Sequence, residues 1–237
     1  MEIHEKVDDR PRALLAWSSG KDSAWALHIL RQRQQVEQVE VVGLLTTINE
    51  ADRRVAMHAV RAEILDAQAR ATGLPLWPVP IPERCSNAVY EAAMGAAMDR
   101  AAREGIQFIA FGDLFLDDMR RYREDRLAPT GVQPLFPLWG LPTATLAHEM
   151  IRAGLRARVT CLDPRQLSPA FAGRDVDAAF LAALPATVDP CGEHGEFHTC
   201  VYDGPMFTQP LALRTGETVL RDGFVVTDLT LPPPAGA

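Results

Sequence analysis

The first half of the chain alternates between short apolar strand-like runs and helix-like segments. The runs are rich in branched apolar residues, and the segments between them repeat apolar residues at helical spacing. This alternation predicts an α/β fold, a parallel sheet with helices on both faces, because parallel strands need crossover connections. The predicted strands span residues 13–17, 39–45, 76–81 and 107–111, and the predicted helices span 21–35, 56–72 and 87–104.

The pattern changes after residue 127, where prolines and glycines become frequent. Mixed elements follow: a helix over 143–154, a strand over 156–161, a helix over 175–184, and hairpin strands over 211–214 and 219–227 around Gly216. We therefore predict a first domain over residues 11–128, a smaller C-terminal α+β subdomain over 129–230 that closes over it, and a tail over 231–237.

A small polar loop joins the first predicted strand to its helix. Backbone N–H groups at such a junction point toward an anion, so the loop is suited to phosphate. Its lysine adds a positive charge, and a carboxylate beside a polyphosphate requires a cation such as Mg²⁺. It is not a Walker loop, because Leu15 occupies the position of the first glycine. An ordinary helix cap is the alternative. The loop consists of Ser18, Ser19, Gly20, Lys21, Asp22 and Ser23.

Other polar residues follow the later strands. In a parallel sheet, ligands bind beyond the carboxyl ends of the strands, so these residues should lie near the loop. Thr46 and Thr47 would approach adenine or ribose, and His58 would contact ribose or phosphate. Gly112 would let the backbone approach the nucleotide, and Asp113 would hold Mg²⁺ or a ribose hydroxyl. A polar strand end and a solvated histidine are the alternatives for the threonines and His58.

Two further clusters are dense in charge. Arg120, Arg121 and Arg123 follow the fourth strand, where guanidinium groups could grip phosphate or carboxylate; a salt-bridged exposed helix is the alternative. The segment 189–199 carries Glu193, His194, Glu196 and His198 between glycines, and could bind ammonium, a metal or the substrate. A polar β-turn is the alternative there.

Charge and cysteine content narrow the class of protein. The net charge is −7, from 31 acidic and 24 basic residues, and no basic stripe gives electrostatic support for nucleic-acid binding. The apolar runs are too short to span a bilayer, and the first residues lack a signal-peptide pattern, so a cytoplasmic location is expected. The four cysteines, at 85, 161, 191 and 200, form no C-x-x-C pair and are expected to be reduced packing residues.

The loop resembles the SGGKDS-type loop of the PP-loop ATP pyrophosphatases, in the adenine nucleotide alpha hydrolase-like superfamily, with Ser19 in place of a glycine. Together with FGDLFLDDMRRYRE, the region around 137–139 and CGEHGEFHTCVYDGP, it resembles the diphthine–ammonia ligase family over about residues 12 to 210. DDMRRYRE and His194 depart from the archaeal and eukaryotic pattern where the acceptor should bind. These departures point to a bacterial branch with a different acceptor.

The resemblance implies ATP-dependent amide synthesis on a PP-loop fold. The acceptor would be a small-molecule or protein-borne carboxylate, the nitrogen donor ammonia, and the cofactors ATP and Mg²⁺; a homodimer is left open. It implies that residues 18–23 hold the triphosphate, with Gly112 and Asp113 completing the pocket. The catalytic candidates are Lys21, Asp22, Glu193 and Glu196, the metal candidates Asp22 and Asp113, and the acceptor candidates Arg120, Arg121, Arg123, Glu193, His194 and Glu196.

Two other functions remain as alternatives. RNA sulfur transfer, another PP-loop chemistry, would require paired catalytic cysteines and a basic surface. A non-catalytic sensor of adenine nucleotides would not need the second polar cluster at 189–199. ATP–pyrophosphate exchange that depends on a carboxylic acid would separate the ligase from the sensor.

Overall fold

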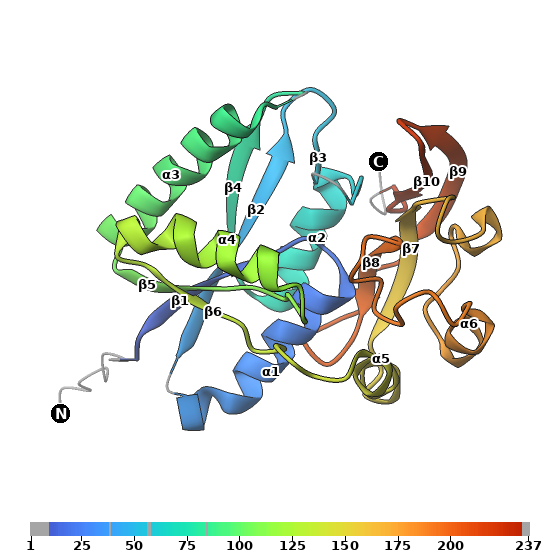
Figure 1. The fold of residues 1–237 in the computed structure, drawn as a ribbon, viewed down its shortest axis with the longest axis horizontal. Helices are drawn as coiled ribbons and strands as arrows, with labels where there is room; N and C mark the ends of the chain where they lie inside the picture. Colours follow the sequence, from blue (N-terminus) through green and yellow to red (C-terminus); the bar gives the residue numbers. More distant parts are fainter. Residues whose placement is uncertain (1–9, 38, 56–57, 84, 234–237) are drawn as a thin grey trace.

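Two sheets lie side by side, each with its own helices (Figure 1). The structure, a computed structural model, describes residues 10–37, 39–55, 58–83 and 85–233. The first sheet contains β1 (Arg12–Ala16), β2 (Glu40–Asn49), β3 (Arg54–Val55), β4 (Leu76–Ile81), β5 (Ile106–Ala110) and β6 (Gln133–Leu135). Its helices are α1 (Lys21–Glu37), α2 (Ala62–Thr72), α3 (Asn87–Arg103) and α4 (Asp117–Leu127). The second sheet contains β7 (Arg156–Leu162), β8 (Phe197–Asp203), β9 (Arg214–Arg221) and β10 (Phe224–Thr230). Beside it are α5 (Thr143–Arg152) and α6 (Ala178–Ala183), and short 3₁₀ helices cover Ala128–Thr130 and Pro169–Phe171.

The first sheet confirms the predicted α/β class. Its parallel strands follow the order β4–β2–β1–β5–β6, and the short β3 pairs antiparallel with the end of β2. Among the described strands β4 pairs with β2 alone, in keeping with its two prolines, which cannot donate to a second neighbour. β6 lies in the proline-rich stretch beyond residue 127 and completes the sheet beside β5.

Helices cover both faces of this sheet because β1 directs alternate side chains to opposite sides. Leu14 packs in one cluster with Met98 of α3, and Leu15 packs in another with Leu27 of α1 and Ile64 of α2. All five side chains are buried. The end of β1, where the polar loop begins, is thereby held in the middle of the layered structure.

The second sheet is antiparallel, in the order β8–β7–β10–β9. The predicted hairpin is present as β9 and β10, but its turn lies at Asp222 and Gly223 rather than around Gly216. Both turn residues have positive φ, 51° for Asp222 and 86° for Gly223, as an Asp-Gly hairpin turn requires. Gly216 lies within β9 and is not part of the turn.

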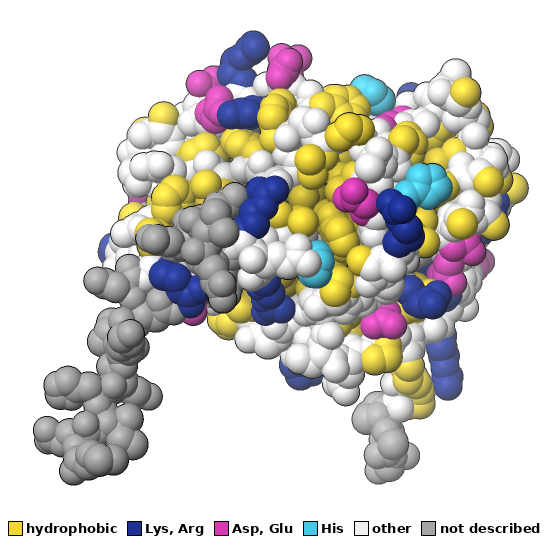
Figure 2. All heavy atoms as spheres, turned by 90° about the horizontal axis from the view of Figure 1, so that it is seen from below, with side chains coloured by type: hydrophobic (Ala, Val, Ile, Leu, Met, Phe, Trp, Pro, Cys, Tyr) yellow, Lys and Arg dark blue, Asp and Glu magenta, His cyan; other side chains and the backbone are white. Residues whose placement is uncertain are grey.

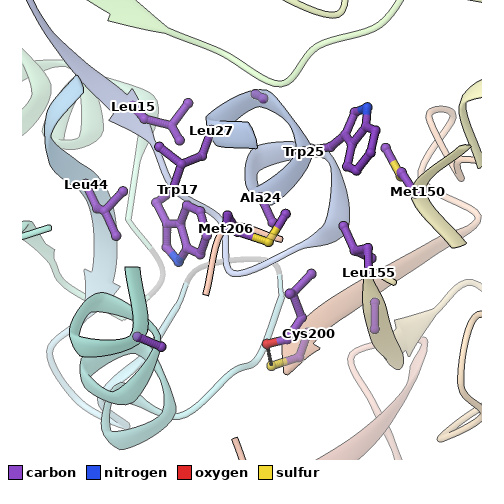
Figure 3. Packing of buried hydrophobic residues seen from close by; sticks show 14 of the residues in the cluster. Leu15, Trp17, Ala24, Trp25, Leu27, Leu44, Met150, Leu155, Cys200 and Met206 are labelled. Atoms are coloured by element: carbon purple, nitrogen blue, oxygen red, sulfur yellow. Dashed lines mark hydrogen bonds between the residues drawn. The ribbon is translucent and has the colours of Figure 1, made fainter. Parts of the chain in front are cut away.

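One hydrophobic cluster joins the two halves of the chain. Figure 3 shows Trp17, Ala24 and Leu27 beside side chains that come from the second half. The contributions from that half include Met150, Leu155, Cys200 and Met206, all buried. Because a continuous core resists separation of its parts, the second half is held firmly against the loop after β1.

Two element boundaries differ from prediction for local reasons. α2 begins at Ala62 rather than near 56; residues 56 and 57 lie outside the described residues, and Ala59 has a positive φ of 56°, which interrupts a helix. β2 continues through Thr46 and Thr47 to Asn49, because β3 and β4 both pair with its last residues. The two threonines therefore lie within the strand and not after it.

Figure 2 views the molecule from below. On this face hydrophobic atoms gather in a central band, and the Lys and Arg side chains are dispersed around it. No helix among the described residues is both long enough and apolar enough to cross a bilayer.

Asp228 of β10 binds two arginines of the first half. Its Oδ1 accepts hydrogen bonds from Arg54 Nη2 at 2.9 Å and from Arg61 Nε at 3.0 Å, and its Oδ2 accepts one from Arg61 Nη2 at 2.7 Å. The hydrogen bonds from Arg61, and then those from Arg54, lower the pKa of Asp228. The ionised carboxylate therefore stabilises the contact between the two halves, and this stability is lost as the pH falls below the ordinary value of 3.8.

We expect Asp228→Asn to lower the free energy of unfolding by about 1–2 kcal/mol at pH 7, because two arginines lose an ionic partner that is only partly open to solvent. Urea unfolding measures the change. The matched control is Asp118→Asn, whose carboxylate is 98% exposed and lies 3.7 Å from Arg121; it should change stability by less than about 0.5 kcal/mol. Equal stability of the two variants would contradict the role of Asp228.

Candidate active site

A cavity of about 780 Å³ lies at the carboxyl ends of β1, β2 and β5 and is closed on its other side by residues 191–199. The topology thus places polar groups from distant parts of the sequence around one space. Ser19, Gly20, Arg120, Arg121 and Glu196 are described but do not line it. The predicted site residues that do line it are Ser18, Lys21, Asp22, Ser23, Thr46, Thr47, His58, Gly112, Asp113, Arg123, Glu193 and His194.

The loop turns sharply from β1 into α1. Ser19, which stands in place of the glycine of the SGGKDS-type loop, has a φ of +69°. This position therefore adopts the left-handed conformation that glycine accepts readily. The hydroxyl of Ser18 accepts the Gly20 N–H at 3.3 Å and lies 3.2 Å from the hydroxyl of Ser23. Gly112 approaches this loop closely, since a Cβ there would lie 2.9 Å from the backbone nitrogen of Ser23. The glycine is thus needed for the end of β5 to pack against the loop.

Lys21 is held by residues from both halves. Its Nζ lies 2.9 Å from Asp22 Oδ2 and also donates to the carbonyl oxygen of Cys191, and it lies 5.3 Å from the centroid of the Phe197 ring. Burial opposes its charge, but the carboxylates of Asp22 and Glu193 outweigh burial and raise the pKa of Lys21. The cavity therefore contains a fixed positive charge.

Three buried side-chain oxygens of the described residues lack a hydrogen-bond partner, and two of them belong to residues that line the cavity. Asp22 Oδ1 and Thr46 Oγ1 make no hydrogen bond within the protein, although both residues line the cavity. Buried polar atoms are usually satisfied, so these oxygens suit a bound group. Asp22 is thus suited to Mg²⁺, which takes one or two carboxylates together with phosphate oxygens.

The carboxylate of Asp113 is already paired with an arginine that also lines the cavity. Arg123 Nε and Nη2 donate to its two carboxylate oxygens at 2.5 and 3.1 Å, and the guanidinium lies over the Phe111 ring. Within the described ranges, no three His, Cys, Asp or Glu side chains come together as a metal site. To bind a cation, Asp113 would have to release Arg123.

The turn that closes the cavity is held by two carboxylates. Asp189 Oδ2 accepts the N–H groups of Cys191 and Glu193, at 3.0 and 3.1 Å. Glu196, 2% exposed, accepts the N–H of Asp189 at 2.8 Å and that of His194 at 2.9 Å. Glu196, expected among the catalytic residues, therefore has both carboxylate oxygens directed into the turn, where it acts as a scaffold.

Glu193 faces the cavity from this turn. Its Oε1 accepts the N–H of Leu114 at 2.8 Å, which ties the turn to the segment after β5. Burial, together with the nearby carboxylates of Asp22 and Asp113, raises the pKa of Glu193 to about 7. A carboxyl group with such a pKa can exchange protons near neutral pH.

Arg120 and Arg121 are placed away from the cavity. Arg120 Nε donates to Glu124 at 2.8 Å, the pairing that the salt-bridged interpretation expected, and its guanidinium lies near the rings of Phe136 and Trp139. Arg121 is 70% exposed. Of the three arginines, Arg123 alone lines the cavity, and its guanidinium is already paired with the carboxylate of Asp113.

Sequence reasoning missed the role of the start of β8. Thr199 Oγ1 accepts the Lys21 N–H at 3.1 Å, at the first turn of α1. The rings of His58 and His198 lie 4.6 Å apart, and His58 contacts the loop so closely that a Cβ on Gly20 would lie 3.0 Å from it. The dense cluster at 189–199 was a signal for this region, but strand pairing decides which of its side chains face the loop.

An apolar wall was also missed. Tyr90 and Met94 of α3, together with Leu116 and Met119 near the start of α4, line the opposite side of the cavity. No sequence motif marks them, because apolar residues on amphipathic helices are most often core residues.

Three of the four cysteines are unsuited to thiolate chemistry. Cys161, Cys191 and Cys200 are buried, and Cys85 is half-buried. Burial raises the pKa of Cys161 to about 11, that of Cys200 to about 12, and that of Cys191 further. These three thiols are protonated at neutral pH.

An α/β sheet with a Ser-Gly-Lys-Asp loop after its first strand, covered by an antiparallel C-terminal sheet, defines a nucleotide-binding protein of the PP-loop type. Residues 11–128 match the diphthamide synthase N-terminal domain, and residues 142–227 match the diphthamide synthase C-terminal domain. The chain belongs to the diphthamide synthase family, and this membership identifies it as an ATP-dependent ligase at the level of the family.

Similar proteins include diphthine–ammonia ligases of mammals. The human enzyme is 24% identical over 227 residues, covering 86% of this chain and 83% of its own. The rat enzyme is 25% identical over 229 residues, with the same coverage of 86% and 83%. Among solved structures, the U34-tRNA thiolase NcsA from Methanococcus maripaludis is 20% identical with a TM-score of 0.38, over 60% of this chain and 56% of that one, little more than half its length.

Two of the histidines that line the cavity, His58 and His198, should make stability depend on pH. Burial lowers the pKa of His58 to about 3 and that of His198 to about 4, below the ordinary value of 6.5. Because the folded-state values are lowered, stability is present above pH 6.5 and is lost as the pH falls. We expect His58→Gln/His198→Gln to recover about 3–4 kcal/mol of the wild-type loss between pH 7 and pH 5 in urea unfolding, about half of it from each histidine.

The matched control for this prediction is His148→Gln, at an exposed position on α5. It should lose as much stability between the two pH values as the wild type does. An identical loss in the double variant would show that the buried imidazoles do not resist protonation.

Proposed function

We propose that this protein forms an amide from a carboxylate, ammonia and ATP. The proposal is supported by the name of its relatives, diphthine–ammonia ligase, which gives ammonia as one of the groups that they join. In the first step a carboxylate oxygen of the acceptor attacks the α-phosphorus of ATP, and the bond to the β-phosphate breaks with release of pyrophosphate. In the second step the nitrogen of ammonia attacks the acyl carbon, and AMP leaves with the electrons of the C–O bond. Adenylation is required because a free carboxylate is a poor electrophile.

The loop is suited to the first step. The N–H groups at the start of α1 and the charge of Lys21 would stabilise the negative charge that develops on pyrophosphate. The unpartnered Asp22 Oδ1 would bind Mg²⁺, which when bound neutralises part of the triphosphate charge. Thr46 Oγ1, also unpartnered, would receive a hydrogen bond from the nucleotide or donate one to it.

Glu193 is suited to the second step. An attacking ammonium ion must lose a proton, and ammonia must lose one after it has attacked the acyl group. A carboxylate whose pKa is raised to about 7 accepts such a proton while remaining partly ionised at neutral pH. Because Glu193 comes from the C-terminal half, the turn at 189–196 would supply the base and the loop would supply the phosphate site.

The observation that carries this proposal is that Glu193 and Lys21 line the same cavity although 172 residues separate them (193 − 21). A nucleotide sensor would not require a buried proton acceptor facing its phosphate site. Sulfur transfer is not favoured, because the three buried thiols are protonated and hydrogen-bonded or packed in the core.

The acceptor is best sought by measuring AMP release across a panel of carboxylic acids, together with ATP–pyrophosphate exchange. We expect an accepted acid to stimulate both, and Lys21→Met to lower exchange at least 100-fold, because it removes a charge that stabilises the leaving group. The control Arg103→Met, at an exposed position of α3, should retain wild-type exchange. Release of ADP rather than AMP would refute adenylation.

Once an acceptor is identified, Glu193→Gln separates the two steps. We expect exchange to persist in this variant and amide formation to fall about 100-fold or more, since the proton acceptor is removed while the phosphate site remains. In the wild type the rate of amide formation should rise as the pH passes through about 7, where Glu193 ionises. An amide yield from Glu193→Gln equal to that of the wild type would exclude Glu193 as the base. So would a wild-type rate of amide formation that does not change as the pH passes through about 7.

A further inference from the structure

Gln68 of α2 is a fully buried amide directly behind the nucleotide loop. Its exposed fraction is 0%, and it does not line the cavity. Its Oε1 accepts the indole N–H of Trp17 at 2.9 Å, and its Nε2 donates to the carbonyl oxygens of Ser19 at 3.2 Å and Val201 at 2.7 Å. A buried amide is tolerated only where its hydrogen bonds are made. Here they connect the end of β1, the loop and β8.

Ser19 is the strained member of this group. Its φ of +69° is unfavourable for a residue with a Cβ, and its buried hydroxyl has no hydrogen-bond partner. Such a conformation persists only where the surroundings over-determine it. Its carbonyl oxygen receives two hydrogen bonds, from Gln68 Nε2 and from the Val201 N–H at 2.9 Å.

The conformation of Ser19 determines where the loop points. The turn at Ser19 redirects the chain from β1 into α1, so that Ser18, Lys21, Asp22 and Ser23 face the cavity. We propose that Gln68 is a positioning residue for the nucleotide site: by holding the Ser19 carbonyl it keeps this peptide in the left-handed conformation. The inference rests on the proposed ATP site, and Gln68 itself contacts no substrate.

The test is a pair of substitutions in two backgrounds, with ATP affinity measured by calorimetry and thermal stability measured in parallel. In the wild-type background we expect Gln68→Met to weaken ATP binding about tenfold and to lower the melting temperature. In the Ser19→Gly background the same substitution should weaken ATP binding less than threefold, because glycine adopts positive φ without the support of Gln68. The melting temperature should still fall, since Trp17 and Val201 lose a partner in both backgrounds.

The control is Thr72→Val, at a buried position of the same helix whose hydroxyl donates to the Ala69 carbonyl. It should lower stability without changing ATP affinity in either background. Should Gln68→Met fail to fold, Gln68→Asn replaces it, because it retains the amide but shortens its reach, and the same pattern is expected.

Three outcomes would overturn the inference. Equal losses of ATP affinity in the two backgrounds would give Gln68 a general structural role, and unchanged affinity in both would give it no role at the site. If the wild type itself binds no ATP, the proposed function fails and the inference fails with it. The other two outcomes require a wild type that binds ATP, so they overturn the inference alone.

Discussion

The closure of β8 onto the nucleotide loop is the interaction on which the rest of the site depends. The Val201 N–H donates to the Ser19 carbonyl oxygen, and Thr199 Oγ1 accepts the Lys21 N–H. These bonds place the turn that precedes β8 over the loop, which brings Glu193 to the cavity. Without them the cavity would lack the polar side chains of the C-terminal half, among them Glu193, His198 and Thr199.

The charges of the cavity are interdependent because few of them are open to water. Lys21 stays charged through Asp22 and Glu193, while burial, and then the proximity of Asp22, raises the pKa of Glu193. The same burial keeps His58 and His198 neutral. An arriving anion would thus meet Lys21 paired with Asp22, Arg123 paired with Asp113, and a Glu193 carboxyl group near the midpoint of its titration. The imidazoles of His58 and His198 beside them are neutral, and this arrangement suits adenylation followed by proton transfer.

Local patterns predicted most of the elements, because apolar periodicity reflects which face each element buries. These patterns failed where strand pairing or backbone strain determines where an element begins or ends. The helix expected from residue 56 begins at Ala62 after a left-handed Ala59, and the hairpin turns at Asp222 and Gly223 rather than at Gly216. For the site, the loop and the turn were apparent as unusual clusters. Gln68 was not, since an isolated polar residue within a helix carries no local signal. Thr199 belonged to the cluster at 189–199, but only strand pairing shows that it faces the loop.

The sequence by itself determined the α/β class, the loop after the first strand and the composition of the turn at 189–199, because each depends on residues close together in the chain. Tertiary structure decided which carboxylates face the cavity. Asp189 and Glu196 are directed into the turn, whereas Glu193 accepts the Leu114 N–H and lines the cavity together with Lys21. The physical reason is that the role of a carboxylate depends on which donors reach it, and those donors lie on segments that only the fold brings together.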